Sequence, residues 1–156
     1  QQLCEDIRGN LTVYEAVVLM MTALGSLRCH DKSRVIPVGY SMLLILYITL
    51  LRRTPEYNEE IRYHISFLPD VKVWTGNLLN VILYIPLGGT IYNMAASIKG
   101  TAFAALLSSV LCEIIQYFTH RGVADINDVL FNLIGACAGA LLFRAFRAFK
   151  KKKDLQ

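Results

Sequence analysis

The sequence predicts an all-α integral membrane protein, a bundle of four or five transmembrane helices. The first observation is composition, because 54% of the 156 residues are hydrophobic. The second is that these residues gather in runs of roughly 17 to 20, the length a helix needs to cross about 30 Å of hydrocarbon. The third is a set of polar residues inside the runs, which are costly in a bilayer and often mark function. We therefore expect one membrane domain over residues 1–156. The runs are Leu11–Leu27, Val35–Leu51, Asn77–Ala95, Thr101–Thr119 and Ile126–Phe143.

The first run decides between four and five spans. It is short, carries Glu15 and follows the acidic pair Glu5-Asp6. A signal peptide is an alternative, since Ala23-Leu24-Gly25 has small residues at a cleavage-like spacing, but a basic leading region is missing. Removing this span would leave every later segment on the same side of the membrane.

The third run contains Pro86, followed by Gly88 and Gly89. Proline removes a backbone donor and clashes with the preceding turn. We therefore expect the third helix to be broken near Pro86.

The fifth run contains the segment Gly135-Ala-Cys-Ala-Gly139, whose small residues let another helix approach closely. Packing within the bundle is one role for this segment. A homodimer through Gly135 and Gly139 is the alternative.

Lysine and arginine predict the orientation of the bundle. They concentrate in the segments that are cytoplasmic if residues 52–76 and the turn His120–Asp125 lie outside, above all in the basic tail 144–156. The C-terminus is therefore expected in the cytoplasm. The net charge of +4 fits contact with an anionic inner leaflet, or a simple anchor, and predicts no nucleic-acid partner.

The longest connection is the extracytoplasmic segment 52–76. Apolar residues recur in it at near-helical spacing between Tyr57 and Leu68, with charged residues between them. This pattern predicts an amphipathic helix on the outer surface, with Trp74 at the membrane interface. A solvated loop over the top of the bundle is the alternative.

Polar residues are expected at one depth near the outer ends of the third, fourth and fifth helices. They recur three, four or seven residues apart, which places them on one face of each helix. At about 1.5 Å rise per residue, Glu113 and Asn132 each lie roughly 9–11 Å below their helix ends. We therefore expect an outward-facing polar pocket between these helices. Its candidate residues are Asn80, Glu113, Gln116, Arg121, Asp125, Asp128 and Asn132.

The same residues allow a structural and a chemical interpretation. In the first, Arg121 pairs with Asp125 or Asp128, and the amides bond across the bundle. In the second, the carboxylates of Glu113, Asp125 and Asp128 hold a divalent cation, or bind a phosphate through one. The four cysteines show no paired spacing and predict no zinc site. A divalent cation is therefore an alternative, and no cofactor is assigned.

The polar residues form an ordered motif. It reads Asn80-x3-Tyr84-Ile-Pro86-Leu-Gly88, then Glu113-x2-Gln116, then Arg121-x3-Asp125-x2-Asp128-x3-Asn132-x2-Gly135. This motif resembles the VanZ-like family of bacterial membrane proteins. The resemblance covers a core of about residues 47–143 and includes Arg53-Thr-Pro55 after the second span. It departs from the family pattern at Tyr84, at Gly89 and in the leading segment.

The resemblance implies a multi-pass protein of the bacterial cytoplasmic membrane that lowers susceptibility to the lipoglycopeptide teicoplanin, and it brings no established reaction. We expect the pocket to engage the drug, a lipid-linked cell-wall precursor or an outer-leaflet lipid. A metal-dependent hydrolase or transferase acting on a lipid is one alternative, and a structural partner of a cell-wall enzyme is another. The sequence has no HExxH, Gly-x-Ser-x-Gly or phosphate-cradling glycine loop, so we favour a non-enzymatic factor.

Overall fold

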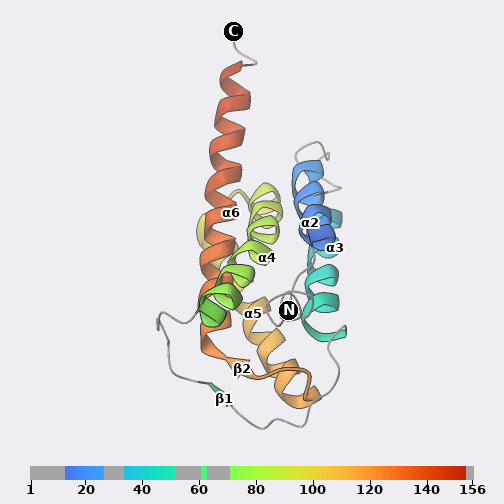
Figure 1. Ribbon diagram of the computed structural model, residues 1–156. Coiled ribbons are helices and arrows are strands. Elements are labelled where there is room, and N and C mark those ends of the chain that lie inside the picture. The colour runs from blue at the N-terminus through green and yellow to red at the C-terminus, as the bar shows by residue number, and fades with distance from the viewer. Residues whose placement is uncertain (1–12, 27–33, 52–60, 63–70, 154–156) are drawn as a thin grey trace.

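The computed structural model describes residues 13–26, 34–51, 61–62 and 71–153 (Figure 1). Within these ranges the fold is a helical bundle with one pair of very short strands. The elements are α2 (Val13–Ser26), α3 (Val35–Leu46), the π-helical segment η2 (Tyr47–Leu51), β1 (Ile61–Arg62), α4 (Val71–Ala95), α5 (Ile98–Thr119), β2 (Ala124–Asp125) and α6 (Ile126–Lys153).

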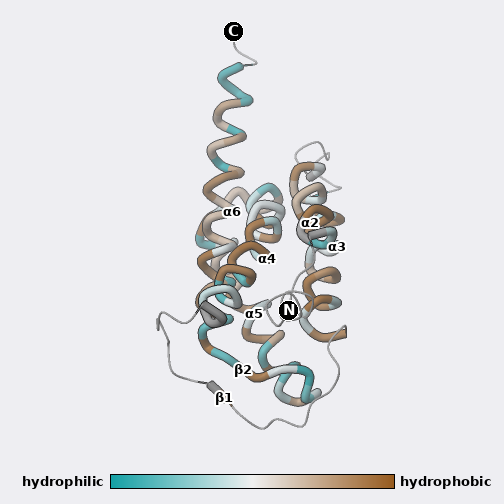
Figure 2. The backbone as a smooth tube through the Cα atoms, viewed as in Figure 1, coloured by the Kyte–Doolittle hydropathy of each residue, from teal (hydrophilic) through white to brown (hydrophobic). Residues whose placement is uncertain are grey.

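Three helices are long and apolar enough to cross a membrane, namely Trp74–Ala95, Ile98–Thr119 and Ile126–Lys153. Val35–Leu51 adds a shorter apolar helix. Hydrophobic residues predominate along the helices, and hydrophilic ones recur around β2, at the end of α4 and along the last turns of α6 (Figure 2). Many large apolar side chains are exposed, as expected of a surface that faces acyl chains rather than water. The prediction of a multi-pass helical membrane protein is therefore confirmed.

The helices run between two ends of the bundle. At the β2 end, α5 finishes and α6 begins; at the opposite tail end, α4 finishes and α5 begins (Figure 1). The chain enters α3 at the tail end, where the Arg34 side chain donates to the carbonyl of Asn93 at 3.3 Å. The last ten residues of α6, from Arg144 to Lys153, remain helical and extend past the other helices.

Helix α4 is the centre of the bundle and packs against α2, α3, α5 and α6. Its Leu83, Tyr84 and Leu87 are buried in one cluster with Leu19 of α2 and Ile45 of α3. Because this helix contributes both core residues and Asn80, its position determines where the polar side chains at the β2 end meet.

The prediction that the third helix is broken near Pro86 is wrong, because α4 runs as one helix from Val71 to Ala95 with Pro86 inside it. Neighbouring helices can hold a proline-containing membrane helix together. Here Pro86 is fully buried, and α6 lies directly against the backbone on either side of it.

The α4–α6 contact is a backbone contact made possible by glycine. A Cβ atom on Gly88 would lie 2.0 Å from the Ala136 carbonyl oxygen, and one on Gly139 would lie 2.0 Å from that of Ile85. Gly135 meets Val81 in the same way. Of the two roles considered for Gly135 and Gly139, packing within the bundle is therefore the one that the structure has. A homodimer stays a prediction, and it would need another surface.

The segment 52–76 also differs from expectation. Helix α4 already begins at Val71, so Trp74 and Gly76 belong to it. Ile61 and Arg62 are extended and pair in parallel with Ala124 and Asp125 of β2, which contradicts a helix at these two positions. Other residues of the predicted amphipathic helix, from 57 to 60 and from 63 to 68, lie outside the described residues.

Candidate functional site

The turn between α5 and α6 is built by local hydrogen bonds. Helix α5 ends at Thr119, and its C-cap residue, His120, adopts the left-handed conformation (φ 52°). The next N–H, that of Arg121, bonds to the Gln116 carbonyl at 3.1 Å. Asp125 then caps α6, because its Oδ1 accepts from the backbone N–H and from the Nδ2 of Asn127, at 2.8 and 2.9 Å. This turn brings the start of α6 back beside the last turns of α5.

Glu113 links α5 to the chain that enters α6. Its side chain is only 8% exposed. Its Oε2 accepts from the backbone N–H of Asp125 at 2.9 Å. The expected proximity of Glu113 and Asp125 is therefore present, through the backbone of Asp125 rather than through its carboxylate.

Asn80 and Asp128 join α4 to the first turn of α6. The Asn80 Nδ2 donates to Asp128 Oδ1 at 2.6 Å. A carboxylate in the first turn of a helix is also favoured by the helix dipole. Close by, Trp74 of α4 meets Phe131 of α6 edge to face, with 6.5 Å between ring centroids. These contacts bring two of the three predicted polar faces together.

Arg121 and Gln116 bind the backbone at the end of η2. The Arg121 Nη1 donates to the carbonyls of Leu50 and Leu51 at 3.2 and 3.3 Å. The Gln116 Nε2 lies 3.4 Å from the carbonyl of Thr49. A helix end leaves carbonyls without partners inside the helix, and here side chains of α5 and of the following turn satisfy them. The sequence did not predict that these backbone carbonyls would be the acceptors, because the pattern of side chains along a sequence does not show which carbonyls lack a partner within their helix.

Asn132 lies deeper in the bundle and donates through Nδ2 to the Ser109 hydroxyl at 2.8 Å. Ser109 was also missed, although Ser108-Ser109 interrupts an apolar run and could have identified it. The amide oxygens of Asn132 and Gln116 are buried and have no partner among the described residues. The bundle therefore retains buried acceptors at two depths.

No group of three or more His, Cys, Asp or Glu side chains that could hold a metal ion occurs in the described parts of the chain. Glu113, Asp125 and Asp128, the predicted metal candidates, do not form such a group. Each of them instead accepts a hydrogen bond from the protein, from the Asp125 N–H, Asn127 and Asn80 respectively.

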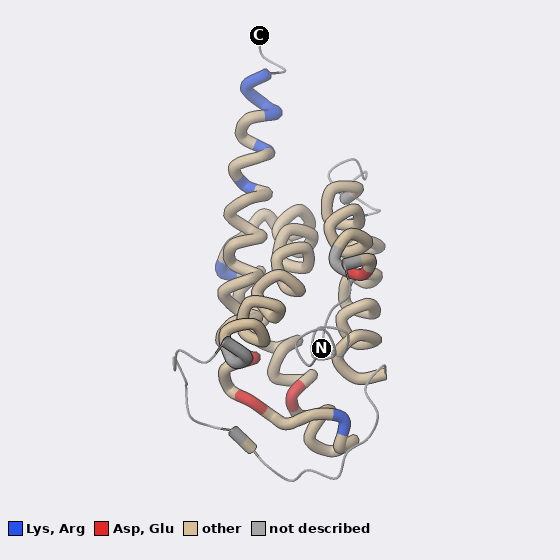
Figure 3. Tube along the Cα trace, viewed as in Figure 1, with Lys and Arg blue, Asp and Glu red and all other residues tan. Residues whose placement is uncertain are grey.

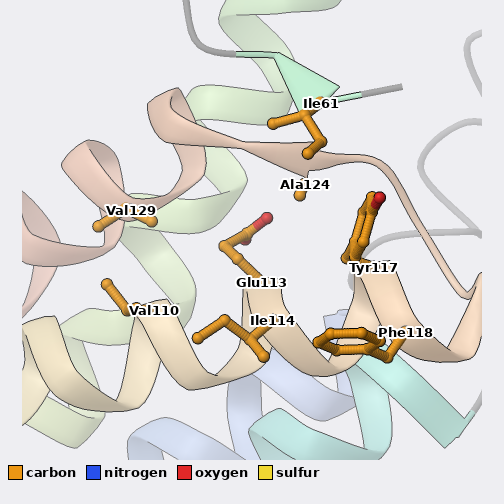
Figure 4. Close-up of a pocket in the computed structure, with 8 residues that line it drawn as sticks. All are labelled: Ile61, Val110, Glu113, Ile114, Tyr117, Phe118, Ala124 and Val129. Carbon is orange, nitrogen blue, oxygen red and sulfur yellow. The ribbon is translucent and has the colours of Figure 1, made fainter. Parts of the chain in front are cut away.

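A cavity of about 230 Å³ opens beside Glu113 (Figure 4). Helix α5 supplies most of its wall, and Ile61 of β1, Ala124 of β2 and Val129 of α6 complete it. The expected pocket differs from this one in two respects, because α4 supplies no lining residue and the surface that the wall exposes is apolar, although Glu113 and Tyr117 contribute to it. Of the seven predicted pocket residues, Glu113 lines this cavity. The other six bind one another, the neighbouring Asn127 and Ser109, or the backbone.

Three lining residues of α5 lie on its exposed face. Val110, Ile114 and Phe118 are 37%, 46% and 75% exposed, although α5 is a candidate span. Since exposed apolar residues of a spanning helix face acyl chains, we expect this rim of the cavity to face the hydrocarbon of the bilayer.

Acidic residues outnumber the one described basic residue, Arg121, in the last turns of α5, β2 and the first turn of α6, and a further acidic residue, Glu15, lies in α2 (Figure 3). Acidic positions occur in the last turns of α5, in β2 and in the first turn of α6, whereas Lys150–Lys153 end α6 at the opposite side. The cavity therefore lies at the acidic end.

Comparison with known proteins gives one match. The VanZ/LLP1 family domain matches residues 13–147, which includes every motif residue and also α2 and α3. No curated protein and no solved structure matches the chain.

Proposed function

The chain belongs to the VanZ/LLP1 family of membrane proteins, and we propose that it lowers susceptibility to lipoglycopeptide antibiotics such as teicoplanin. In this proposal the cavity beside Glu113 engages the drug, a lipid-linked cell-wall precursor or a lipid of the outer leaflet. The protein acts by binding rather than by a reaction.

The proposal rests on one observation, that the buried Glu113 lies at the wall of an apolar cavity whose rim consists of exposed apolar side chains of α5. Buried ionisable groups in membrane spans are rare and are by default functional candidates. Lipoglycopeptides, lipid-linked precursors and outer-leaflet lipids all carry an apolar chain, which the apolar surface of this wall fits, together with polar groups.

The proposal needs the β2 end to face outward and the tail end to face the cytoplasm. The concentration of Lys and Arg from Arg144 to Lys153 supports this orientation. In a variant without native cysteines, we expect a cysteine at Thr119 to react with an impermeant thiol reagent in intact cells. A cysteine at Lys153 should react only after permeabilisation. Labelling of Lys153→Cys in intact cells would show that the tail end faces outward, and this result would contradict the proposal.

The functional test replaces two carboxylates by their amides. Glu113→Gln and Asp128→Asn keep side-chain size, and polar contacts between membrane helices contribute only about 0.6 kcal/mol on average. We expect both variants to accumulate in the membrane and to restore teicoplanin susceptibility to that of cells lacking the protein. The readouts are the minimal inhibitory concentration, membrane abundance and thermal unfolding in detergent.

A matched control is Glu15→Gln in α2, which removes a carboxylate away from the cavity. It should leave susceptibility unchanged. If Glu113→Gln and Asp128→Asn keep wild-type resistance, or lose it only in proportion to lost protein, the polar residues have a structural role.

A further inference from the structure

The last ten residues of α6 form a helical arm at the tail end of the molecule. Helix α6 runs without a break from Ile126 to Lys153. Since about 20 residues of a helix cross the hydrocarbon of a bilayer, we expect a span that begins at Ile126 to end near Ala145. The residues from Arg144 to Lys153, here called the basic arm, extend past the other helices (Figure 1). The basic arm therefore falls in the head-group region and just beyond it.

The basic arm is rich in cations (Figure 3). Six of its ten residues are Lys or Arg and none is acidic, although Asp154 follows it. Five of the six cations are exposed, and Arg147 is half-buried. The six are Arg144, Arg147, Lys150, Lys151, Lys152 and Lys153. Such a density of positive charge requires an anionic partner or water around it.

Phenylalanines form a second face of the same arm. Phe143 is buried, and its ring packs against Gly89 of α4, where an added Cβ would meet it at 2.4 Å. Phe146 and Phe149 follow at steps of three residues, so they continue this row past the end of the bundle. They are 49% and 74% exposed. Cations on one face of a helix and large apolar rings on another are typical of a helix at a membrane surface rather than of a solvated run of charges.

The positions of the cations fit a layer of phosphate groups. Arg144 and Arg147 are the cations nearest the hydrocarbon, and a guanidinium can donate two parallel hydrogen bonds to one phosphate. From Arg147 to Lys153 the helix rises about 9 Å. This rise is within the Debye length of about 10 Å at 0.1 M salt, so the lysines also act on the head groups. Clusters of roughly four to eight Lys and Arg directly after a membrane span are attracted to anionic lipids in this way.

We propose that the basic arm binds anionic lipids of the leaflet at the tail end, of the phosphatidylglycerol type, whose phosphate has no ammonium group beside it. Arg144 and Arg147 donate to phosphate oxygens, and the four lysines attract further head groups. Phe146 and Phe149 insert between the upper parts of the acyl chains. The basic arm is then a lipid-binding site rather than a simple anchor. It lies at the opposite end of the molecule from the cavity beside Glu113 and is independent of the proposed function.

The test uses the full chain without native cysteines in nanodiscs of a phosphatidylcholine-type lipid. A fluorophore is attached to a cysteine at Ala148, an exposed position of the basic arm. A nitroxide quencher near the head-group end of one acyl chain is carried by either a phosphatidylglycerol or a phosphatidylcholine lipid. We expect the phosphatidylglycerol lipid to quench at a roughly fivefold lower concentration, the effect of one basic side chain near an anionic membrane surface. At about 1 M salt, where the Debye length is roughly 3 Å, the two lipids should quench alike.

A fluorophore at the other end of α5 and α6 gives the internal control. Thr119 is exposed at the β2 end, where acidic residues outnumber the described basic one. A fluorophore on a cysteine at Thr119 should therefore show no preference for the phosphatidylglycerol lipid.

Two variants separate charge from the shape of the arm. Replacing all six cations by glutamine should abolish the preference at Ala148 and leave thermal unfolding unchanged, because these side chains lie at the free end of α6. This variant combines Arg144→Gln, Arg147→Gln, Lys150→Gln, Lys151→Gln, Lys152→Gln and Lys153→Gln. The matched control keeps the charge and should keep the preference. It combines Lys150→Arg, Lys151→Arg, Lys152→Arg and Lys153→Arg.

Equal quenching at Ala148 by the two lipids at 0.1 M salt would overturn the inference and would leave the cations to a soluble acidic partner. A preference that persists in the glutamine variant would also overturn it, because the charge of the basic arm would then not be its cause. If the glutamine variant does not enter nanodiscs, the comparison of low and high salt on the wild-type arm still decides.

Discussion

Helices α4 and α6 meet in two different ways along their length. Midway, glycines bring the two backbones together, and a Cβ on Gly139 would lie 2.0 Å from the Ile85 carbonyl oxygen. At the β2 end the helices are joined by side chains instead, with a hydrogen bond of 2.6 Å from Asn80 to Asp128.

The two contacts differ in whether they offer a ligand space and hydrogen-bonding groups. The glycine contact leaves no space and no polar side chain, so a ligand has nothing to bind there. Dispersion between closely packed backbones stabilises it. At the β2 end, the helices are joined by hydrogen bonds whose partners a ligand or water can replace. A cavity of about 230 Å³ lies beside them. The middle of the α4–α6 pair holds the two helices together, and the β2 end is where we propose that a ligand binds.

The largest effect on stability is expected at the glycine contact. Gly139→Ala places a methyl group on the Ile85 carbonyl and should force the helices apart, at a cost of about 1–3 kcal/mol. The matched control is Gly39→Ala in α3, where a Cβ meets nothing within 4 Å. Alanine is the better helix former, so this control should be neutral or stabilising by up to about 1 kcal/mol. Thermal unfolding in detergent and membrane abundance measure both, and equal behaviour of the two variants would contradict the close packing.

A comparable or smaller effect is expected at Arg121. Arg121→Gln removes the donors to the Leu50 and Leu51 carbonyls and should cost about 1–3 kcal/mol if these acceptors stay dry. Arg121→Lys keeps the charge but loses the planar set of donors, so its effect should be intermediate. Arg144→Gln, on the exposed part of α6, is the control without a structural cost. A wild-type melting temperature for Arg121→Gln would mean that water replaces the guanidinium.

The smallest effect is expected between Asn132 and Ser109. A double-mutant cycle with Asn132→Ala and Ser109→Ala should give a coupling free energy near the average of about 0.6 kcal/mol for polar contacts between membrane helices. Unfolding in a denaturing detergent measures it. A coupling of several kcal/mol would show that the deeper polar layer stabilises the bundle far more than we infer.

Much of the architecture follows from the sequence alone. Apolar runs of spanning length predict the helices because a bilayer requires every backbone polar group to bond within its own helix. The run Thr101–Thr119 corresponds closely to α5, and the run Asn77–Ala95 ends where α4 ends. Spacing along a helix also identified Glu113 and Asp128 as residues on inward faces, which their hydrogen bonds to Asp125 and Asn80 now support.

The features that the sequence could not determine depend on how neighbouring helices pack against one another. Whether Pro86 breaks its helix depended on α6 lying against it. That Arg121 binds backbone carbonyls depended on η2 ending nearby. The cavity lies between α5, β2 and α6 rather than among the polar side chains, because those side chains satisfy one another first. The spacing of polar residues predicts which face of a helix is polar. Only the packed tertiary structure determines which side chains and backbone groups bond on that face, and where a cavity remains.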